Sequence, residues 1–115
     1  MKFPVVRGGL YAADLNPRRG TEAGKVHPAV VVQTNLLNEV QHPSTVILPC
    51  TTRLTGESLL RVLLPSGMAG NRIDCEIMID QVRAIDNRRL RRQLGTVPRP
   101  LLVEIEAKLH RLLEL

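Results

Sequence analysis

The sequence has few of the residues on which several large classes of protein depend. Tryptophan is absent, and Phe3 and Tyr11 are the only aromatic residues among 115. This scarcity argues against recognition of RNA by stacking of bases on aromatic side chains. No apolar run approaches the roughly 20 residues that cross a bilayer, and the N-terminus has no signal-peptide core. We therefore expect one domain over residues 1–115, located in the cytoplasm and not in contact with a membrane.

Motifs for metals and nucleotides are also missing. The three histidines, His27, His42 and His110, are dispersed, and no cysteine–histidine spacing resembles a zinc framework. The acidic residues form no Asp-X-Asp cluster for magnesium, and no glycine-rich phosphate loop is present. Cys50 and Cys75 lie in apolar segments and are interpreted as buried free thiols, with a disulfide or a metal pair as the alternatives. We expect no metal and no cofactor, so any chemistry has to come from side chains alone.

Arginine dominates the charged residues. The chain has 16 Lys and Arg against 11 Asp and Glu, a formal net charge of +5, and thirteen of the basic residues are arginine. Five of these arginines lie between positions 83 and 92. The planar guanidinium group fits phosphate oxygens in bidentate fashion, so this bias favours an anionic partner. A solvated basic loop at 83–92 is the alternative interpretation.

The pattern of apolar residues predicts a chain made mainly of short strands. β-Branched or alternating segments predict strands at 8–15, 28–34, 44–52, 59–64 and 76–85. Pro49 indicates an edge, a bulge or a strand end, because proline cannot donate to a central ladder. In the last strand neither face is purely apolar, so we expect it to present polar groups to a functional surface.

The C-terminal segment has a different period. From Pro98, a favourable first helical residue, leucine and isoleucine recur at helical spacing, and Glu104 and Lys108 form an i,i+4 pair expected on the outer side. A short turn or helix is also expected at 35–39. Together the elements predict an α+β, mainly β fold. This fold would be a small SH3-like barrel of about five to seven short antiparallel strands with a C-terminal amphipathic helix.

Side chains alone can cut RNA, because the ribose 2′-OH can attack the neighbouring phosphate. The protein then has to supply a base, an acid for the departing 5′-oxygen and donors for the developing phosphorane charge. Glu22, Lys25, His27 and Thr51 are suitable for these tasks. Composition by itself does not select them.

Three segments, in order along the chain, resemble the MazF/PemK/Kid toxins. These are RGGLYAADLNPRRGTEAGKVHPAVVVQ (7–33), ILPCTT (47–52) and IMIDQVRAIDNRRL (77–90), followed by a leucine-rich terminal helix. The resemblance implies a homodimeric MazF-type barrel and a toxin of a type II toxin–antitoxin system. It further implies a metal-independent, sequence-specific endoribonuclease that cuts single-stranded mRNA, leaves a 2′,3′-cyclic phosphate and inhibits growth. A cognate MazE-type antitoxin would restrain it by covering the RNA groove.

The same resemblance implies candidate site residues. The catalytic threonine of the family falls on Thr51 and its loop glutamate on Glu22, whereas the family's arginine is replaced by His27. Three interpretations of this replacement are open: His27 acts as acid or base, a nearby cation supplies the lost charge, or the site is weakened. The cations in question are Lys25, Arg18 and Arg19. The expected RNA-binding residues are Arg18, Arg19, Lys25, Thr52, Arg53, Gln81 and Arg83.

Two functions other than RNA cleavage are also compatible with the fold. The barrel resembles that of the CcdB gyrase poisons, which bind a protein target, and a catalytically weakened homologue would bind RNA or an antitoxin without cutting. The Gly-Thr-Glu loop at 20–22 and the Cys-Thr-Thr block at 50–52 favour the ribonuclease, since a gyrase poison has no need of them.

Overall fold

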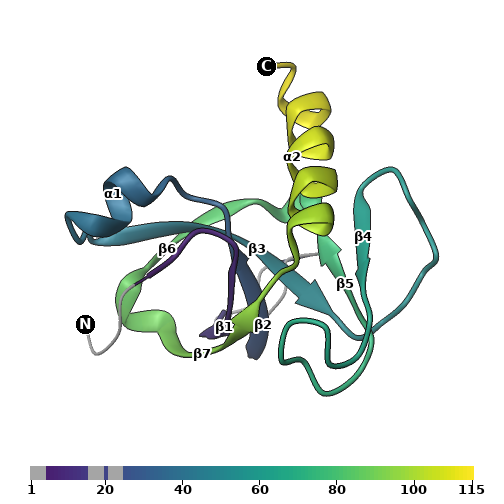
Figure 1. Cartoon of the computed structure of the whole chain (residues 1–115), viewed down its shortest axis with the longest axis horizontal. Helices are drawn as coiled ribbons and strands as arrows, with labels where there is room; N and C mark the ends of the chain where they lie inside the picture. The colour runs from purple at the N-terminus through teal and green to yellow at the C-terminus, as the bar shows by residue number, and fades with distance from the viewer. Residues whose placement is uncertain (1–4, 16–19, 21–24) are drawn as a thin grey trace.

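The structure is a computed structural model, and it describes residues 5–15, 20 and 25–115. Seven antiparallel strands form one bent sheet, and a long C-terminal helix packs against it (Figure 1). This architecture confirms the predicted mainly β fold. The strands are β1 (Gly9–Asp14), β2 (Val26–Val31), β3 (Ser44–Thr51), β4 (Arg61–Leu64), β5 (Cys75–Met78), β6 (Arg83–Asp86) and β7 (Leu90–Thr96). The helices are α1 (Asn35–Glu39) and α2 (Arg99–Leu113), with 3-10 turns η1 (Ile79–Gln81) and η2 (Asn87–Arg89).

Both faces of the central strands are buried. The strand order is β4-β5-β3-β2-β1-β7, with β6 also paired to β3. Leu10, Val30 and Leu48 are register partners on one face, where they form a core that includes Ile105 of α2. The side chains between them point the other way, because neighbours on a strand alternate. These side chains form a second core, which includes Tyr11, Ala29, Val31 and Ile47.

The sheet curls until the loop between β4 and β5 meets β7. A Cβ atom added to Gly70 would overlap the carbonyl of Leu94, and one added to Gly95 would overlap the carbonyl of Ala69. Gly70 also has a φ of +83°, a conformation that L side chains rarely adopt. Two glycines therefore allow direct contact between the two backbones. This contact brings opposite ends of the strand order together.

The segment predicted as one strand at 76–85 is divided in the structure, so that prediction was wrong. β5 and β6 both pair with β3, but the 3-10 turn η1 separates them. Between the pairs Ile47–Arg83 and Cys50–Ile77, the β5–η1–β6 side has more residues than β3, and the surplus is taken up by the turn. Pro49 lies in this interval, in the middle of a central strand. It is tolerated there because no ladder bond from its nitrogen is required.

Strand β7 was not predicted from the sequence. Its residues 90–96 belong to the arginine-rich region, and β7 pairs with β1 through most of its length. Arg91, Arg92 and Gln93 are exposed, and only Leu90 is buried. A short exposed strand with so little apolar alternation gives no period-2 signal.

Helix α2 differs from expectation in which side chains it buries. Ile105 is buried, and Leu101, Leu102 and Leu109 pack against the same core, as the spacing predicted. Leu112 and Leu113 are exposed, and the C-terminal turns extend beyond the sheet in Figure 1. The Glu104–Lys108 pair does form, at 2.9 Å, but Lys108 is buried rather than on the outer side. Its ammonium group donates to the carbonyl of Arg61 at 2.8 Å, which satisfies the buried charge.

Cys50 and Cys75 are both buried free thiols, as predicted. A hydrogen bond with Cys75, together with burial, raises the pKa of the Cys50 thiol well above its ordinary value. The Cys50 thiol therefore stays protonated at neutral pH. No helix within residues 5–15, 20 and 25–115 has the length and apolar character needed to cross a bilayer.

Candidate active site

His27 and Thr51 lie near the ends of the neighbouring strands β2 and β3. The pairing of these strands stops at Ala29 and Pro49, and each of the two polar residues lies two positions beyond that pair. Because side chains alternate along a strand, His27 and Thr51 point to the same face as Ala29 and Pro49. Ala29 and Pro49 are buried, whereas His27 and Thr51 are half-buried. The apolar face thus ends in two partly accessible polar side chains.

The hydroxyl of Thr51 takes part in a local turn. Its Oγ1 accepts a hydrogen bond from the backbone N–H of Arg53 at 3.1 Å. A hydroxyl that accepts one bond still carries a proton that it can donate elsewhere. Thr51 can therefore act as a donor toward a bound anion while its position is held by the turn.

Glu76 is the cross-strand neighbour of Thr51. The two residues pair between β5 and β3, so their side chains share a face of the sheet. Burial raises the pKa of the Glu76 carboxyl, but hydrogen bonds from the backbone of Gly56, the backbone and hydroxyl of Thr55 and the guanidinium of Arg61 outweigh it. The pKa of Glu76 is consequently held below its ordinary value. A buried carboxylate, ionised at neutral pH, therefore lies beside the candidate threonine.

A cavity of about 380 Å³ adjoins the ends of these strands. Part of its wall is polar and basic, since His27 and Thr52 are joined there by the exposed side chains of Arg72 and Arg92. The two guanidinium groups suit a phosphate-bearing ligand. The lining residues are Ala12, Val26, His27, Pro28, Thr52, Gly70, Asn71, Arg72, Ile73, Cys75, Arg92, Gln93 and Leu94.

The predicted site residues fall into three groups. His27 and Thr51 share one face at the strand ends, and His27 and Thr52 line the cavity, whereas Thr51 lies outside the cavity lining. Arg53 is exposed directly after them, and Lys25 precedes β2 with a φ of 61° and a backbone carbonyl that accepts from Leu15 at 2.7 Å. Outside the cavity lining are Gln81, in η1, and Arg83, in β6. Arg18, Arg19 and Glu22 lie outside the described residues.

The arginine-rich region does not form one patch. Arg92 lines the cavity, but Arg91 is its neighbour on β7 and pairs with Asp14 at 3.1 Å. Arg88 pairs with Asp86 at 3.0 Å, and this contact lowers the pKa of the Asp86 carboxyl. The alternation of β7 and the intervening turn distribute the positive charge among several directions.

Sequence reasoning did not single out Arg72, Asn71 or Glu76, and it included Arg92 only as one of the five arginines between positions 83 and 92. The side-chain amide of Asn71 donates to the carbonyls of Leu64, Pro65 and Ile73, and so it shapes the loop that carries Arg72 to the cavity. An Asn-Arg pair in a Gly-containing loop could have suggested a structured turn. For Glu76, the only local signal was a single charge at the start of a β-branched segment.

Metal ligation is not indicated by the described residues. Within that part of the chain, no group of three or more His, Cys, Asp or Glu side chains lies close enough together to hold an ion.

The sequence matches the family model for a "PemK-like, MazF-like toxin of type II toxin-antitoxin system" over residues 6–113. It is 32% identical over 110 residues to endoribonuclease MazF9 of Mycobacterium tuberculosis, covering 90% of this chain and 93% of that protein. It is 33% identical over 87 residues to endoribonuclease EndoA of Bacillus subtilis, covering 75% and 74% of the two chains.

The fold is similar to that of solved structures from Deinococcus radiodurans. The MazF crystal structure (Form-I) superposes with a TM-score of 0.85 at 28% identity, over 99% of this chain and 100% of that one. A MazE–MazF crystal structure (Form-III) gives a TM-score of 0.79 at 28% identity, with 98% and 99% of the chains covered.

Proposed function

Because the chain belongs to the PemK-like, MazF-like toxins of type II toxin–antitoxin systems, we propose that it is an endoribonuclease that cuts single-stranded mRNA and thereby inhibits growth. The endoribonucleases MazF9 and EndoA, to which it is similar over most of its length, support this activity. The observation that carries the proposal is the shared face of His27 and Thr51 beside a cavity with two arginines.

The proposed reaction needs no group from outside the protein and the RNA. The 2′-oxygen bonds to the adjacent phosphorus, the bond from phosphorus to the 5′-oxygen breaks, and the products are a 2′,3′-cyclic phosphate and a 5′-hydroxyl. One proton leaves the 2′-OH and one reaches the 5′-oxygen. His27 serves one of these transfers, and the hydroxyl of Thr51 donates to the phosphorane oxygens.

The cavity supports this chemistry by holding the flanking RNA. Arg72 and Arg92 come from different elements and are both exposed at the cavity wall. Phosphate contacts of this kind fix the register of a nucleic acid without reading its sequence. Bases would be read by hydrogen bonds from groups such as Thr52 and Gln93, since aromatic side chains are scarce.

Cleavage should persist in excess EDTA and leave a 2′,3′-cyclic phosphate. The reason is that the attacking oxygen belongs to the substrate and the candidate catalysts are protein side chains. The measurement is incubation with a long single-stranded RNA, with and without EDTA, followed by analysis of the product ends. Cleavage that appears only after magnesium is added would contradict the proposed mechanism.

We further propose that the chain acts in the cytoplasm and is restrained by a MazE-type antitoxin. The MazE–MazF structure from Deinococcus radiodurans supports a partner of that kind. A protein that covered the His27–Thr51 face and the basic cavity would exclude RNA from both.

The protein should form a homodimer with twofold symmetry at micromolar concentration. Large apolar side chains remain exposed on both helices, among them Leu36 and Leu37 on α1 and Val103 and Leu113 on α2. Their burial between two copies would be favourable. Sedimentation equilibrium measures the mass directly, and a stable monomer across the micromolar range would be the contrary result.

A further inference from the structure

Glu76 has an unusual place for a carboxylate, inside the sheet and next to the candidate catalytic threonine. Only 3% of its surface is exposed. A buried charge is retained at low cost only if its oxygens are hydrogen-bonded. Both oxygens of Glu76 are: Oε2 accepts the backbone N–H groups of Thr55 at 3.0 Å and Gly56 at 2.9 Å. Oε1 accepts the hydroxyl of Thr55 and the guanidinium of Arg61, each at 3.0 Å.

Three of these four bonds come from the segment that connects β3 to β4. The segment 52–60 starts directly after Thr51, and residues 52–59 are all exposed. Because it buries so little apolar surface, its conformation has to be determined largely by hydrogen bonds. Gly56 has a φ of +73°, and this turn lets two successive N–H groups converge on one carboxylate oxygen.

The remaining bonds of the segment connect near neighbours. Thr51 accepts from Arg53, and the hydroxyl of Thr55 accepts from Glu57 at 3.2 Å. The carboxylate of Glu57 accepts from the backbone of Leu59 and Leu60. These contacts give the segment internal turns, whereas Glu76 connects its middle, at Thr55 and Gly56, to the sheet.

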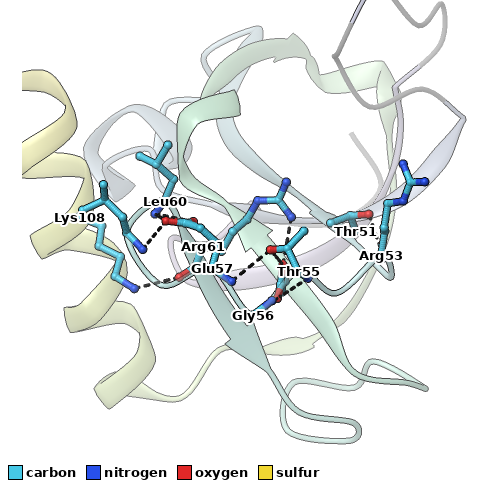
Figure 2. A network of polar contacts seen from close by, with 10 residues as sticks. Thr51, Arg53, Thr55, Gly56, Glu57, Leu60, Arg61 and Lys108 are labelled. Atoms are coloured by element: carbon cyan, nitrogen blue, oxygen red, sulfur yellow. Dashed lines mark hydrogen bonds and ion pairs between the residues drawn. The ribbon is translucent and has the colours of Figure 1, made fainter.

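The attachment point is itself held by the long helix. Arg61, which pairs with Glu76, accepts at its backbone carbonyl from Lys108 of α2 at 2.8 Å. Figure 2 shows this connected set of contacts from α2 through Arg61 to the segment. Glu76 is therefore anchored to two rigid elements, β5 and β4, and β4 is braced in turn by α2.

The segment leads directly into the proposed RNA site. Thr52 lines the cavity, Arg53 follows it, and only Leu54 separates Arg53 from the anchored Thr55. We propose that Glu76 is a positioning residue that holds segment 52–60 against the RNA site and so determines which bases beside the cleaved phosphate are accepted. This inference rests on the proposed ribonuclease function.

The test is Glu76→Gln, which keeps the shape of the side chain and removes its charge. A glutamine amide has one oxygen and one NH₂ group. Its NH₂ group must therefore face either the backbone N–H groups of Thr55 and Gly56 or the guanidinium of Arg61, all of which are donors. Hence we expect KM for the preferred RNA to rise about 10-fold, while kcat changes less than about 3-fold. Mapped on a long single-stranded RNA, cuts should also appear at sequences that the wild-type protein leaves intact.

Glu104→Gln is the matched control, because it neutralises a carboxylate at the far end of the same network. Thr55→Val is a milder second variant, which removes one hydroxyl bond and keeps both backbone bonds. A 2- to 10-fold rise in KM is expected for it, about the net effect of one hydrogen bond. If Glu76→Gln does not fold, KM and site selection in Thr55→Val decide the question.

Thermal unfolding supplies an independent check that the contact is ionic. The pKa of Glu76 is lowered from an ordinary value of 4.5, so its contribution to stability is fully present above that pH and is lost as pH falls through the lowered pKa. The difference in Tm between wild type and Glu76→Gln should therefore be constant near neutral pH and shrink in acid. A difference that does not shrink would contradict a buried ionised contact.

The results distinguish this inference from the proposed function. If the wild-type protein leaves RNA intact, both the proposed ribonuclease function and the positioning role of Glu76 are contradicted. A wild-type protein that cuts, with Glu76→Gln unchanged in KM and in cleavage sites, would overturn the positioning role alone. An equal loss of kcat in Glu76→Gln and Glu104→Gln would also overturn it, since it would indicate a general structural effect.

Discussion

His27→Ala should reduce the rate of RNA cleavage by about 10²- to 10⁴-fold, the usual contribution of a positioned acid or base. His27 is half-buried at the end of β2, on the face that it shares with Thr51. The ordinary pKa of histidine, about 6.5, allows it to take up or release a proton at neutral pH. The wild-type rate should therefore follow a titration between pH 5.5 and 8.5. Single-turnover cleavage of one RNA substrate across that range measures both effects.

Two further variants separate proton transfer from simple positive charge. His27→Arg should retain or increase activity and flatten the pH profile, because arginine stays protonated throughout this range. If Lys25 supplies the charge instead, Lys25→Ala should be the damaging change and His27→Ala should be mild. A flat wild-type profile combined with an active His27→Ala protein would exclude His27 as a catalyst.

Thr51→Ala should lower cleavage by about 10²- to 10³-fold, which is the typical cost of removing one donor to a developing oxyanion. The fold should change little. The hydroxyl's visible contact is with the exposed N–H of Arg53, which water can replace at a cost of about 1 kcal/mol. Rate measurements under saturating RNA, together with thermal unfolding, test the two halves of this expectation.

The control for Thr51 is a pair of variants. Thr51→Ser keeps the hydroxyl and should keep most of the activity. Thr96→Ala removes an exposed threonine from β7 and should behave as wild type. If Thr51→Ala turns over as fast as Thr96→Ala, Thr51 is a strand residue without a catalytic role.

Much of the fold could be predicted from the sequence, because its signals are local. The β-branched runs at 28–34 and 44–52 became β2 and β3, and the leucine spacing after Pro98 became α2. The division of 76–85 could not be predicted, since it depends on the registers in which β5 and β6 pair with β3 on either side of Pro49. Strand β7 was also not predicted, because it is defined by pairing with β1, which is remote in the sequence.

The roles of the candidate site residues stay predictions. His27 and Thr51 were predicted to be catalytic and Thr52 to bind RNA; the strands place His27 and Thr51 on one face, and His27 and Thr52 line the cavity. Gln81 and Arg83 were expected to bind RNA, but they lie outside the cavity lining, so their role stays a prediction. Lys108 was expected on the outer side of α2 and is buried instead. Its ammonium group donates a hydrogen bond to the backbone carbonyl of Arg61, in the neighbouring strand β4.

The sequence by itself determined the family, the mainly β class, the buried thiols and the terminal helix, since ordered motifs and hydrophobic periodicity are properties of neighbouring residues. Only the tertiary structure decided that Arg72 and Arg92 meet at one cavity and that Glu76 lies beside Thr51 while holding Thr55 and Gly56. Those relations depend on strand register and on the contact of the β4–β5 loop with β7. Both arise from pairings between distant parts of the chain, which no local pattern encodes.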